Sequence, residues 1–445
     1  MTEYKPMQVL PDEPGYGAGD VLVLIGELFG RGYANGMVVE AKRLGMTVIG
    51  TTVGRRYSDG SLRALSPEEL KEAEALLGGK IINIPLEAGF DMEVVDGQPS
   101  LIEQMRKTDP ADMQLTNISE SFIENAKEAG TARFRKAIAR VALELLSVIP
   151  VEANVICAHI MAGGIPRARM VMPFLNRVFK GVGGPFMSSE AFSKSRLGQI
   201  CNFGFNEVSA ETFSYFIEET TALRERVKSA GTHIAYIAYG YHGTGVLVGG
   251  TYRWQSYTPY LPGGAKIRLE NIAAEAFTRG ITATVFNCPE IQTNSSALFI
   301  GCELSLYPLL TSIREIAGNS AVAPLYERCQ SLLKDGETLE NLLERANMYL
   351  ESPVIAKLFD FNKWPLHNTP EQSASTLTSS AELFAMQRDQ KKLVSTELSR
   401  IVFLATGRLM LHASRNPCAA TLWLNHDIIA SLLSSNYFRS RILPD

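Results

Sequence analysis

The sequence predicts an α/β fold in which a doubly wound, mostly parallel sheet carries helices on both faces. Short apolar runs rich in valine and isoleucine recur without alternating polar residues, as is typical of strands buried on both faces. Helical patterns fill the segments between these runs, and such an alternation favours parallel strands joined by crossover helices. After residue 288 the strand signal stops, and helical patterns continue through the rest of the sequence.

The expected elements follow one another in order. The runs with strand character are residues 21–25, 47–53, 80–86, 154–159, 233–239 and 282–288. The helices between them are expected at residues 34–44, 67–77, 131–148, 209–229 and 269–279. Later helices are expected at residues 304–316, 324–334, 338–350, 381–411 and 419–434. The polar segment 367–380 predicts a loop among them.

Composition and charge argue against several classes of protein. The 445 residues include 43 Lys+Arg and 47 Asp+Glu, and the net charge of −4 argues against a nucleic-acid-binding surface. The six cysteines form no CxxC pair, which disfavours a disulfide framework or a metal site and predicts free thiols in the cytoplasm. No apolar stretch reaches the ~20 residues that cross a bilayer, and the first residues lack the apolar segment of a secretory signal.

A glycine-rich loop follows the first expected strand. Gly26, Gly30, Arg31 and Gly32 form a G-x-x-x-G-x-G pattern between that strand and a helix. Glycines allow a tight turn and a close approach of the backbone to a pyrophosphate, which the helix N-terminus attracts. We therefore expect a dinucleotide-binding core of Rossmann type with insertions at residues 1–300. The helical residues 301–445 would pack on its substrate side as a cover. The alternative is an ordinary glycine-rich turn.

The ends of the second and third strands bear on the choice of cofactor. Arg55 and Arg56 follow the second strand, where NAD-binding proteins carry an acidic residue that holds the ribose. Arginine can accommodate the 2′-phosphate of NADP, so the sequence favours NADPH over NADH. Glu87 and Ala88 end the third strand and are expected to face the adenine. The alternative for the arginines is a solvated loop.

Tyrosines precede a lysine after the fifth strand. Tyr257 and Tyr260 precede Lys266, whereas Pro262 stands where the Tyr-x-x-x-Lys pattern of many ketoreductases would place its tyrosine. A tyrosine can stabilise the oxygen that becomes negative when a conjugated double bond is reduced, and a nearby ammonium lowers the pKa of the phenol. The alternative is an aromatic loop with a surface lysine.

These residues resemble a known family. Tyr257 and Lys266 are similar to the Tyr-x8-Lys motif of FabV-type enoyl-ACP reductases and trans-2-enoyl-CoA reductases, which are enlarged short-chain dehydrogenase/reductases. Segments such as GELFGRGYANG, AGGIPRARMVMPFLNRVFKG and NCPEIQTNSSALF resemble the enoyl-ACP reductase FabMG family over nearly the whole chain.

The resemblance implies roles for further residues. Tyr257 would stabilise the enolate, Lys266 would bind the ribose and tune Tyr257, and Tyr241 would assist at the substrate oxygen. Additional residues implied near the cofactor are Ala158, His159, Pro289, Ile291 and Thr293. The additional residues implied near the substrate are Ser295 and Ser296, and Tyr260 is an extra candidate that the family pattern does not require.

The expected function is NAD(P)H-dependent reduction of the 2,3 double bond of a trans-2-enoyl thioester. The thioester would be carried by acyl carrier protein or by CoA, and the sequence is compatible with a homo-oligomer. Two alternatives stay open. One is an NADPH-dependent ketone or enone reductase of secondary metabolism. The other is a non-catalytic dinucleotide-binding protein.

Overall fold

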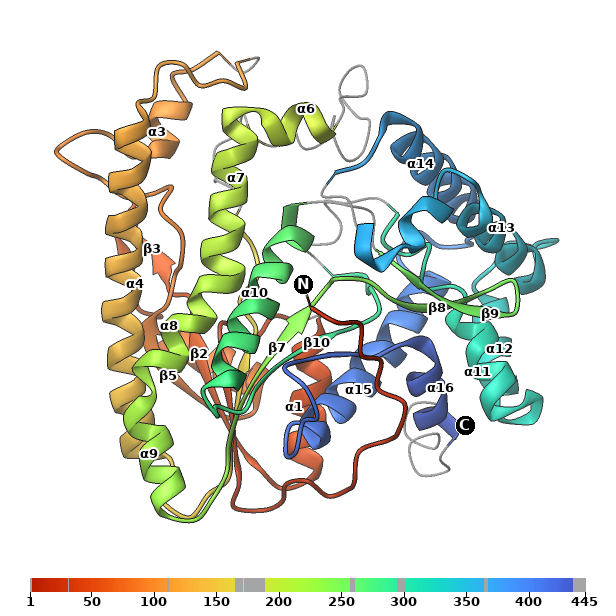
Figure 1. Ribbon diagram of the computed structural model, residues 1–445, viewed down its shortest axis with the longest axis horizontal. Coiled ribbons are helices and arrows are strands. Elements are labelled where there is room, and N and C mark those ends of the chain that lie inside the picture. Colours follow the sequence, from red (N-terminus) through yellow and green to blue (C-terminus); the bar gives the residue numbers. More distant parts are fainter. Residues whose placement is uncertain are drawn as a thin grey trace.

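The centre of the molecule is a seven-stranded parallel sheet. The structure is a computed structural model, and it describes residues 2–30, 32–109, 112–164, 171, 189–256, 261–293, 301–363 and 367–434. The strand order is β11-β10-β7-β6-β1-β2-β5 (Figure 1). The strands are β1 (Val21–Ile25), β2 (Thr47–Thr52), β5 (Lys80–Pro85), β6 (Val155–His159), β7 (Ile234–Gly240), β10 (Ala283–Asn287) and β11 (Thr421–Trp423). The order reverses between β1 and β6, so the sheet is doubly wound as the sequence predicted.

Side chains of each strand alternate between two hydrophobic layers. In β1, Leu22 and Leu24 join one buried cluster, while Val21, Val23 and Ile25 join the other. Both faces of the strand are therefore buried, which explains the continuous apolar runs in the sequence. The six runs with strand character coincide with the first six of these strands to within two residues at either end.

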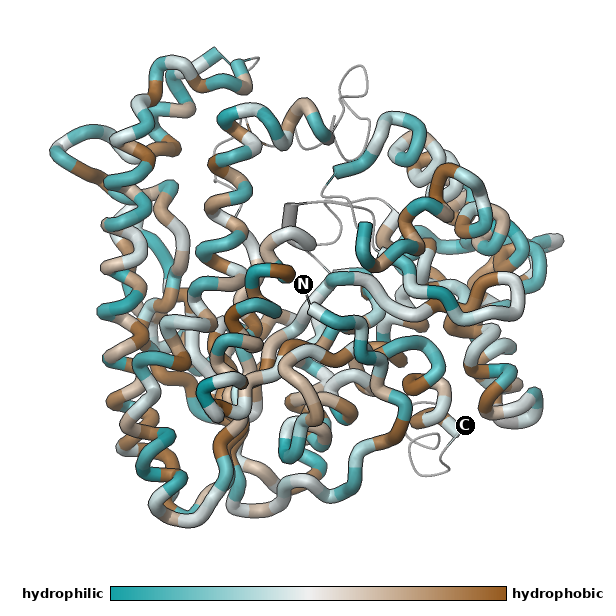
Figure 2. The backbone as a smooth tube through the Cα atoms, in the orientation of Figure 1, coloured by the Kyte–Doolittle hydropathy of each residue, from teal (hydrophilic) through white to brown (hydrophobic). Residues whose placement is uncertain are grey.

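Helices cover both faces of the sheet (Figure 1). The helices on the Val21 face are α4 (Glu120–Val148), α8 (Thr212–Glu219), α9 (Thr221–Ser229) and α10 (Leu261–Thr278). The helices on the Leu22 face include α1 (Tyr33–Arg43), α2 (Pro67–Leu77), α11 (Leu309–Ala317), α15 (Val394–Ala413) and α16 (His426–Ser434). Figure 2 shows hydrophilic and hydrophobic residues alternating along α4, as expected for a helix with one buried side.

Two glycines let α1 and α15 approach each other closely. A Cβ atom on Gly36 of α1 would lie only 1.8 Å from the carbonyl oxygen of Phe403 in α15. A Cβ atom on Gly407 of α15 would lie 2.2 Å from the carbonyl carbon of Gly36. Any larger side chain at either position would force the two helices apart.

A third hydrophobic cluster forms a lobe beyond the carboxyl ends of the strands. It includes residues of α3 (Leu101–Met105), α7 (Arg196–Asn206) and the first half of α4, and α6 (Ser189–Lys194) packs beside α7. A π-helical turn, η1 (Glu207–Glu211), joins α7 to α8. The remaining elements are β3 (Arg55–Arg56), β4 (Leu62–Arg63), β8 (Thr244–Val248), β9 (Thr251–Gln255), α12 (Asn319–Ser331), α13 (Leu339–Glu351), η3 (Ala356–Phe359), η4 (Phe361–Lys363) and α14 (Pro370–Ala385).

Two expectations for the last third of the chain are wrong. β11 lies inside the stretch 419–434 that the sequence predicted as helix, and it pairs with β10 in parallel. The expected loop at residues 367–380 is largely the helix α14. Thr369 caps that helix, Pro370 begins it, and Gln372 completes a capping box. Among the described residues, no helix combines the length and hydrophobicity that a membrane span requires.

Candidate active site

A cavity of about 560 Å³ lies at the carboxyl edge of the sheet, where the strand order reverses. Ligands of doubly wound sheets bind at this place because the loops that leave β1 and β6 diverge there. The segments that follow six strands contribute to its wall. One residue from each is Gly26, Val53, Glu87, Ile160, Tyr241 and Glu290.

The glycine-rich loop forms one end of the cavity. Gly26 has a φ of 118°, and a Cβ atom there would lie 2.9 Å from Ile160 Cγ1. Gly32 precedes α1, and no described side chain caps the N-terminus of this helix. The first turn of α1 also has no acidic residue. The N–H groups at this helix end can therefore meet an anion. Gly30 lies outside the cavity wall, and Arg31 lies outside the described residues.

Glu27 brings a carboxylate from the glycine-rich loop to the end of β2. Its Oε2 accepts hydrogen bonds from Thr52 Oγ1 at 2.8 Å and from the Val53 N–H at 3.2 Å. Arg55 donates to both carboxylate oxygens, at 3.0 and 2.8 Å. Burial alone would raise the pKa of Glu27, but the hydrogen bonds from Arg55 and Thr52 outweigh it and lower that pKa. The buried carboxylate lines the cavity.

Arg56 is also held by a carboxylate. Its Nη2 lies 2.5 Å from Glu87 Oε2, and Glu87 and Ala88 both line the cavity. Neither Arg55 nor Arg56 is among the described residues of the cavity wall. Of these two ion pairs, the described cavity wall therefore contains the glutamates and not the arginines.

Lys266 stands in the opposite part of the wall, on α10. Its side chain is only 2% exposed, and its Nζ lies 5.0 Å from the centre of the Tyr241 ring. Burial lowers the pKa of Lys266 to about 7, although Cys288 raises it slightly. The Tyr33 ring lies 5.4 Å from the Tyr239 ring and 5.8 Å from the Tyr241 ring, so three tyrosines line one side of the cavity.

His159, at the end of β6, has one nitrogen engaged. Thr212 Oγ1 donates to the Val208 carbonyl, so it accepts from His159 Nε2 at 2.8 Å. His159 Nδ1 is buried and has no hydrogen-bond partner among the described residues. Burial, and then the charge of Lys266, lowers the pKa of His159 well below its ordinary value. The neutral ring thus keeps an acceptor in the cavity wall. Ala158 is buried in the core outside this wall.

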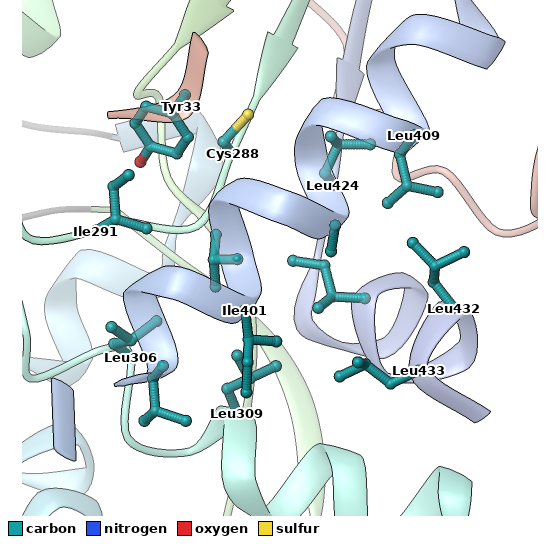
Figure 3. Close-up of a cluster of buried hydrophobic side chains, with 14 of the residues drawn as sticks. Tyr33, Cys288, Ile291, Leu306, Leu309, Ile401, Leu409, Leu424, Leu432 and Leu433 are labelled. Carbon is teal, nitrogen blue, oxygen red and sulfur yellow. The ribbon is translucent and has the colours of Figure 1, made fainter. Parts of the chain in front are cut away.

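The turn after β10 is fixed from two sides. The Tyr33 hydroxyl donates to the Pro289 carbonyl at 2.6 Å. On the other side, the Gln292 N–H donates to Ser399 Oγ at 2.9 Å, and Thr396 Oγ1 donates to Gln292 Oε1 at 3.1 Å. Figure 3 shows Tyr33, Cys288 and Ile291 beside the leucine-rich cluster around α15. Ile291 and Thr293 line the cavity, whereas Pro289 supports the turn from behind.

Several wall residues were missed by the sequence analysis, among them Glu27, Tyr33, Tyr239 and Glu290. Glu290 is buried in the turn after β10, and the Tyr239 hydroxyl is buried with no hydrogen-bond partner among the described residues. Glu290 lies between the expected positions Pro289 and Ile291, so its place in the motif was the available signal. Tyr239 looked like an ordinary strand residue.

The family model of the enoyl-acyl carrier protein reductase FabMG matches residues 3–433 of this chain. The chain belongs to the FabMG family. It is an enoyl-acyl carrier protein reductase and thus an oxidoreductase.

Two solved FabMG structures are similar to this chain over nearly its whole length. An apo structure of FabMG shares 44% sequence identity at a TM-score of 0.93 and covers 97% of both chains. An NADH-bound structure of FabMG shares 37% identity at a TM-score of 0.77 and covers 97% of this chain and 98% of that chain. No curated protein matches the chain.

The expected preference for NADPH is wrong. A FabMG structure at 37% identity is described with NADH bound. The physical reason lies in this chain's own arginines. Arg55 and Arg56 bind Glu27 and Glu87, so neither guanidinium is offered to a 2′-phosphate.

Several residues expected in the FabMG site lie outside the described part of the chain. They are Tyr257, Tyr260, Ser295 and Ser296. Their roles stay predictions. Every described residue that lines the cavity precedes residue 294, so the substrate cover at 301–445 also stays a prediction.

Proposed function

We propose that this FabMG enzyme reduces the 2,3 double bond of a trans-2-enoyl chain carried by acyl carrier protein, with NADH as the reductant. The observation that carries the proposal is the buried Lys266 beside Tyr241 in the cavity wall, in a chain of this family. An ammonium in a poorly hydrated wall can stabilise a negatively charged oxygen far better than it would in water.

The residues of the cavity fit a reduced dinucleotide. The end of α1, which no described side chain caps, suits the pyrophosphate, and Gly26 lets the loop before that helix pack closely against Ile160 and Met161. Glu27 suits the ribose, because Arg55 Nη2 is the one described donor to its Oε1, which keeps a lone pair for the 2′-hydroxyl. A 2′-phosphate at that place would meet the carboxylate of Glu27, which supports NADH. Glu87 and Ala88 remain candidates for the adenine.

The chain's own residues would then divide the work at the reacting atoms. When bound, the reduced nicotinamide supplies the hydride that adds to C3 of the enoyl chain. Lys266 would hold the ribose and keep the pKa of Tyr257 low, and Tyr257 would donate a hydrogen bond to the enolate oxygen. Tyr241 would assist from beside Lys266. His159 Nδ1 would accept a hydrogen bond from the ribose or carboxamide.

An assay of cofactor oxidation tests the proposal. We expect NADH to be oxidised by crotonyl-acyl carrier protein, more slowly by crotonyl-CoA, and not by acetoacetyl-acyl carrier protein. NADPH should be a much poorer reductant. Oxidation with the β-ketoacyl substrate alone would favour a ketoreductase. NADH binding without oxidation by any substrate in the panel would favour a non-catalytic protein.

Three further expectations stay predictions. They are the division of the chain at residue 300, a homo-oligomeric state and a cytoplasmic location. Sedimentation of the purified protein tests the second.

A further inference from the structure

Glu290 is a buried carboxyl group in the wall of the cavity. It lies in the turn that the Tyr33 hydroxyl and α15 fix from opposite sides, and it is 6% exposed. The register of the sheet pairs Asn287 of β10 with Gly240 of β7, so the residues after these strands lie side by side. Glu290 therefore belongs to the same part of the wall as Tyr241 and Lys266.

The described groups that act on the carboxyl group of Glu290 are a thiol, another carboxyl group and two phenols. Cys302 donates a hydrogen bond to its carboxyl group, and the nearby titratable groups are Glu303, Tyr241 and Tyr349. Among the described residues, no lysine, arginine or histidine forms an ion pair with Glu290. Burial raises the pKa of Glu290 to about 8. The hydrogen bond from Cys302 lowers this pKa, and the charge of Glu303 raises it further. The group is thus mainly protonated at neutral pH.

Reduction of an enoyl thioester needs a proton as well as a hydride. Addition of hydride to C3 leaves an enolate, and the reaction is complete only when C2 forms a bond to hydrogen. A neutral carboxyl group held at a fixed place in a dry wall can supply that proton to one face of C2. Lys266 and the tyrosines are expected at the ribose and at the enolate oxygen, which leaves the proton for C2 to a separate side chain or to water.

We propose that Glu290 is the proton donor to C2 of the enolate. This inference rests on the proposed function. In the step, the Glu290 O–H bond breaks, its proton forms the new C2–H bond with the enolate electron pair, and the carboxylate later regains a proton from water. One hydride and one proton are thus added across the double bond.

The test uses the full-length enzyme, NADH and crotonyl-acyl carrier protein in D2O. We expect the wild type to place deuterium on one face of C2, as read by NMR after the released acid is converted to an ester of a chiral alcohol. Glu290→Gln should lose this selectivity and lower kcat by about 100-fold. NADH binding, measured by fluorescence, should stay within about twofold, because the isosteric amide preserves the turn. Glu303→Gln makes the same chemical change beside Cys302 but outside the cavity wall, and should keep one-face labelling.

Retention of one-face labelling by folded Glu290→Gln would overturn the inference, whatever the change in kcat. If that variant does not fold, Glu290→Asp keeps a carboxyl group in the turn and should label one face at a lower kcat. Labelling of both faces by folded Glu290→Asp, or by the wild type, would also overturn the inference. A wild type that does not oxidise NADH with the enoyl substrate would instead refute the proposed function, before any variant is made.

Discussion

The side-chain nitrogen of Lys266 lies 5.0 Å from the centre of the Tyr241 ring, within the range of a cation–π contact. This contact joins α10 to the segment after β7 at the wall of the cavity. Among the described residues, no carboxylate forms an ion pair with this lysine. Its positive charge is therefore open to a bound phenolate, enolate or ribose.

Lys266→Met should abolish most of the activity. The variant keeps the length of the apolar stem but removes the ammonium, so we expect kcat with NADH and crotonyl-acyl carrier protein to fall by about 100-fold or more. The dissociation constant for NADH should also rise. Lys71→Met, at an exposed position of α2, is the matched control and should behave as the wild type. Near-normal kcat in Lys266→Met would remove this lysine from the mechanism.

The same lysine should make stability depend on pH. Burial lowers the pKa of Lys266 from its ordinary 10.5 to about 7, so between these values the unfolded chain binds more protons than the folded one. Linkage then makes the free energy of unfolding rise with pH across that window, and adds no slope below it. Urea unfolding without cofactor should show that the free energy of unfolding rises more between about pH 7 and about pH 9 for the wild type than for Lys266→Met. Equal gains would contradict a lowered pKa of Lys266 in the folded protein.

Glu27→Gln should weaken the preference for NADH. The amide removes the negative charge at the end of β2 and loosens Arg55, which can then turn toward a 2′-phosphate. We expect the ratio of the NADPH and NADH dissociation constants to fall by about tenfold, which is about 1.4 kcal/mol. Glu69→Gln breaks the comparable pair with Arg63 away from the cavity and should leave the ratio unchanged. An unchanged ratio in Glu27→Gln would place the discrimination elsewhere.

Gly36→Ala should destabilise the fold. The new Cβ would overlap the Phe403 carbonyl in α15, and such overpacking costs about 2 kcal/mol or more of unfolding free energy. Gly17→Ala is the control, because no atom lies within 4 Å of its Cβ, and its effect should stay within about 0.5 kcal/mol. Chemical denaturation of both variants measures the difference. Equal stabilities would mean that α1 and α15 can separate at little cost.

Six strands of the central sheet could be predicted because each reads as a continuous apolar run, and all of them except the edge strand β5 are buried on both faces. β11 could not be, since Thr421–Trp423 becomes a strand only through its pairing with β10, far away in the sequence. The case of α14 is different. Thr369, Pro370 and Gln372 form the capping pattern of a helix start, but the small polar residues that follow are typical of a loop, and the loop was predicted.

The cofactor preference failed for a geometric reason. The search for an acidic residue followed β2 along the sequence, but the carboxylate at its end belongs to Glu27, which follows β1. Adjacent parallel strands place the two loops side by side, and sequence order does not reveal this. The Tyr239 hydroxyl was hidden in the same way, because nothing in a strand pattern shows which buried hydroxyl lacks a partner.

None of the described residues of α15 lines the cavity, but this helix contacts two elements that carry parts of the cavity wall. At one end Gly407 meets Gly36 of the phosphate-side helix, and at the other Ser399 holds the turn that carries Glu290. α15 therefore fixes the distance between the proposed pyrophosphate site and the proposed proton donor, although none of its described residues lines the cavity. Efforts to widen the range of reductants or acyl chains should therefore vary the back of α15 as well as the residues that face the ligand.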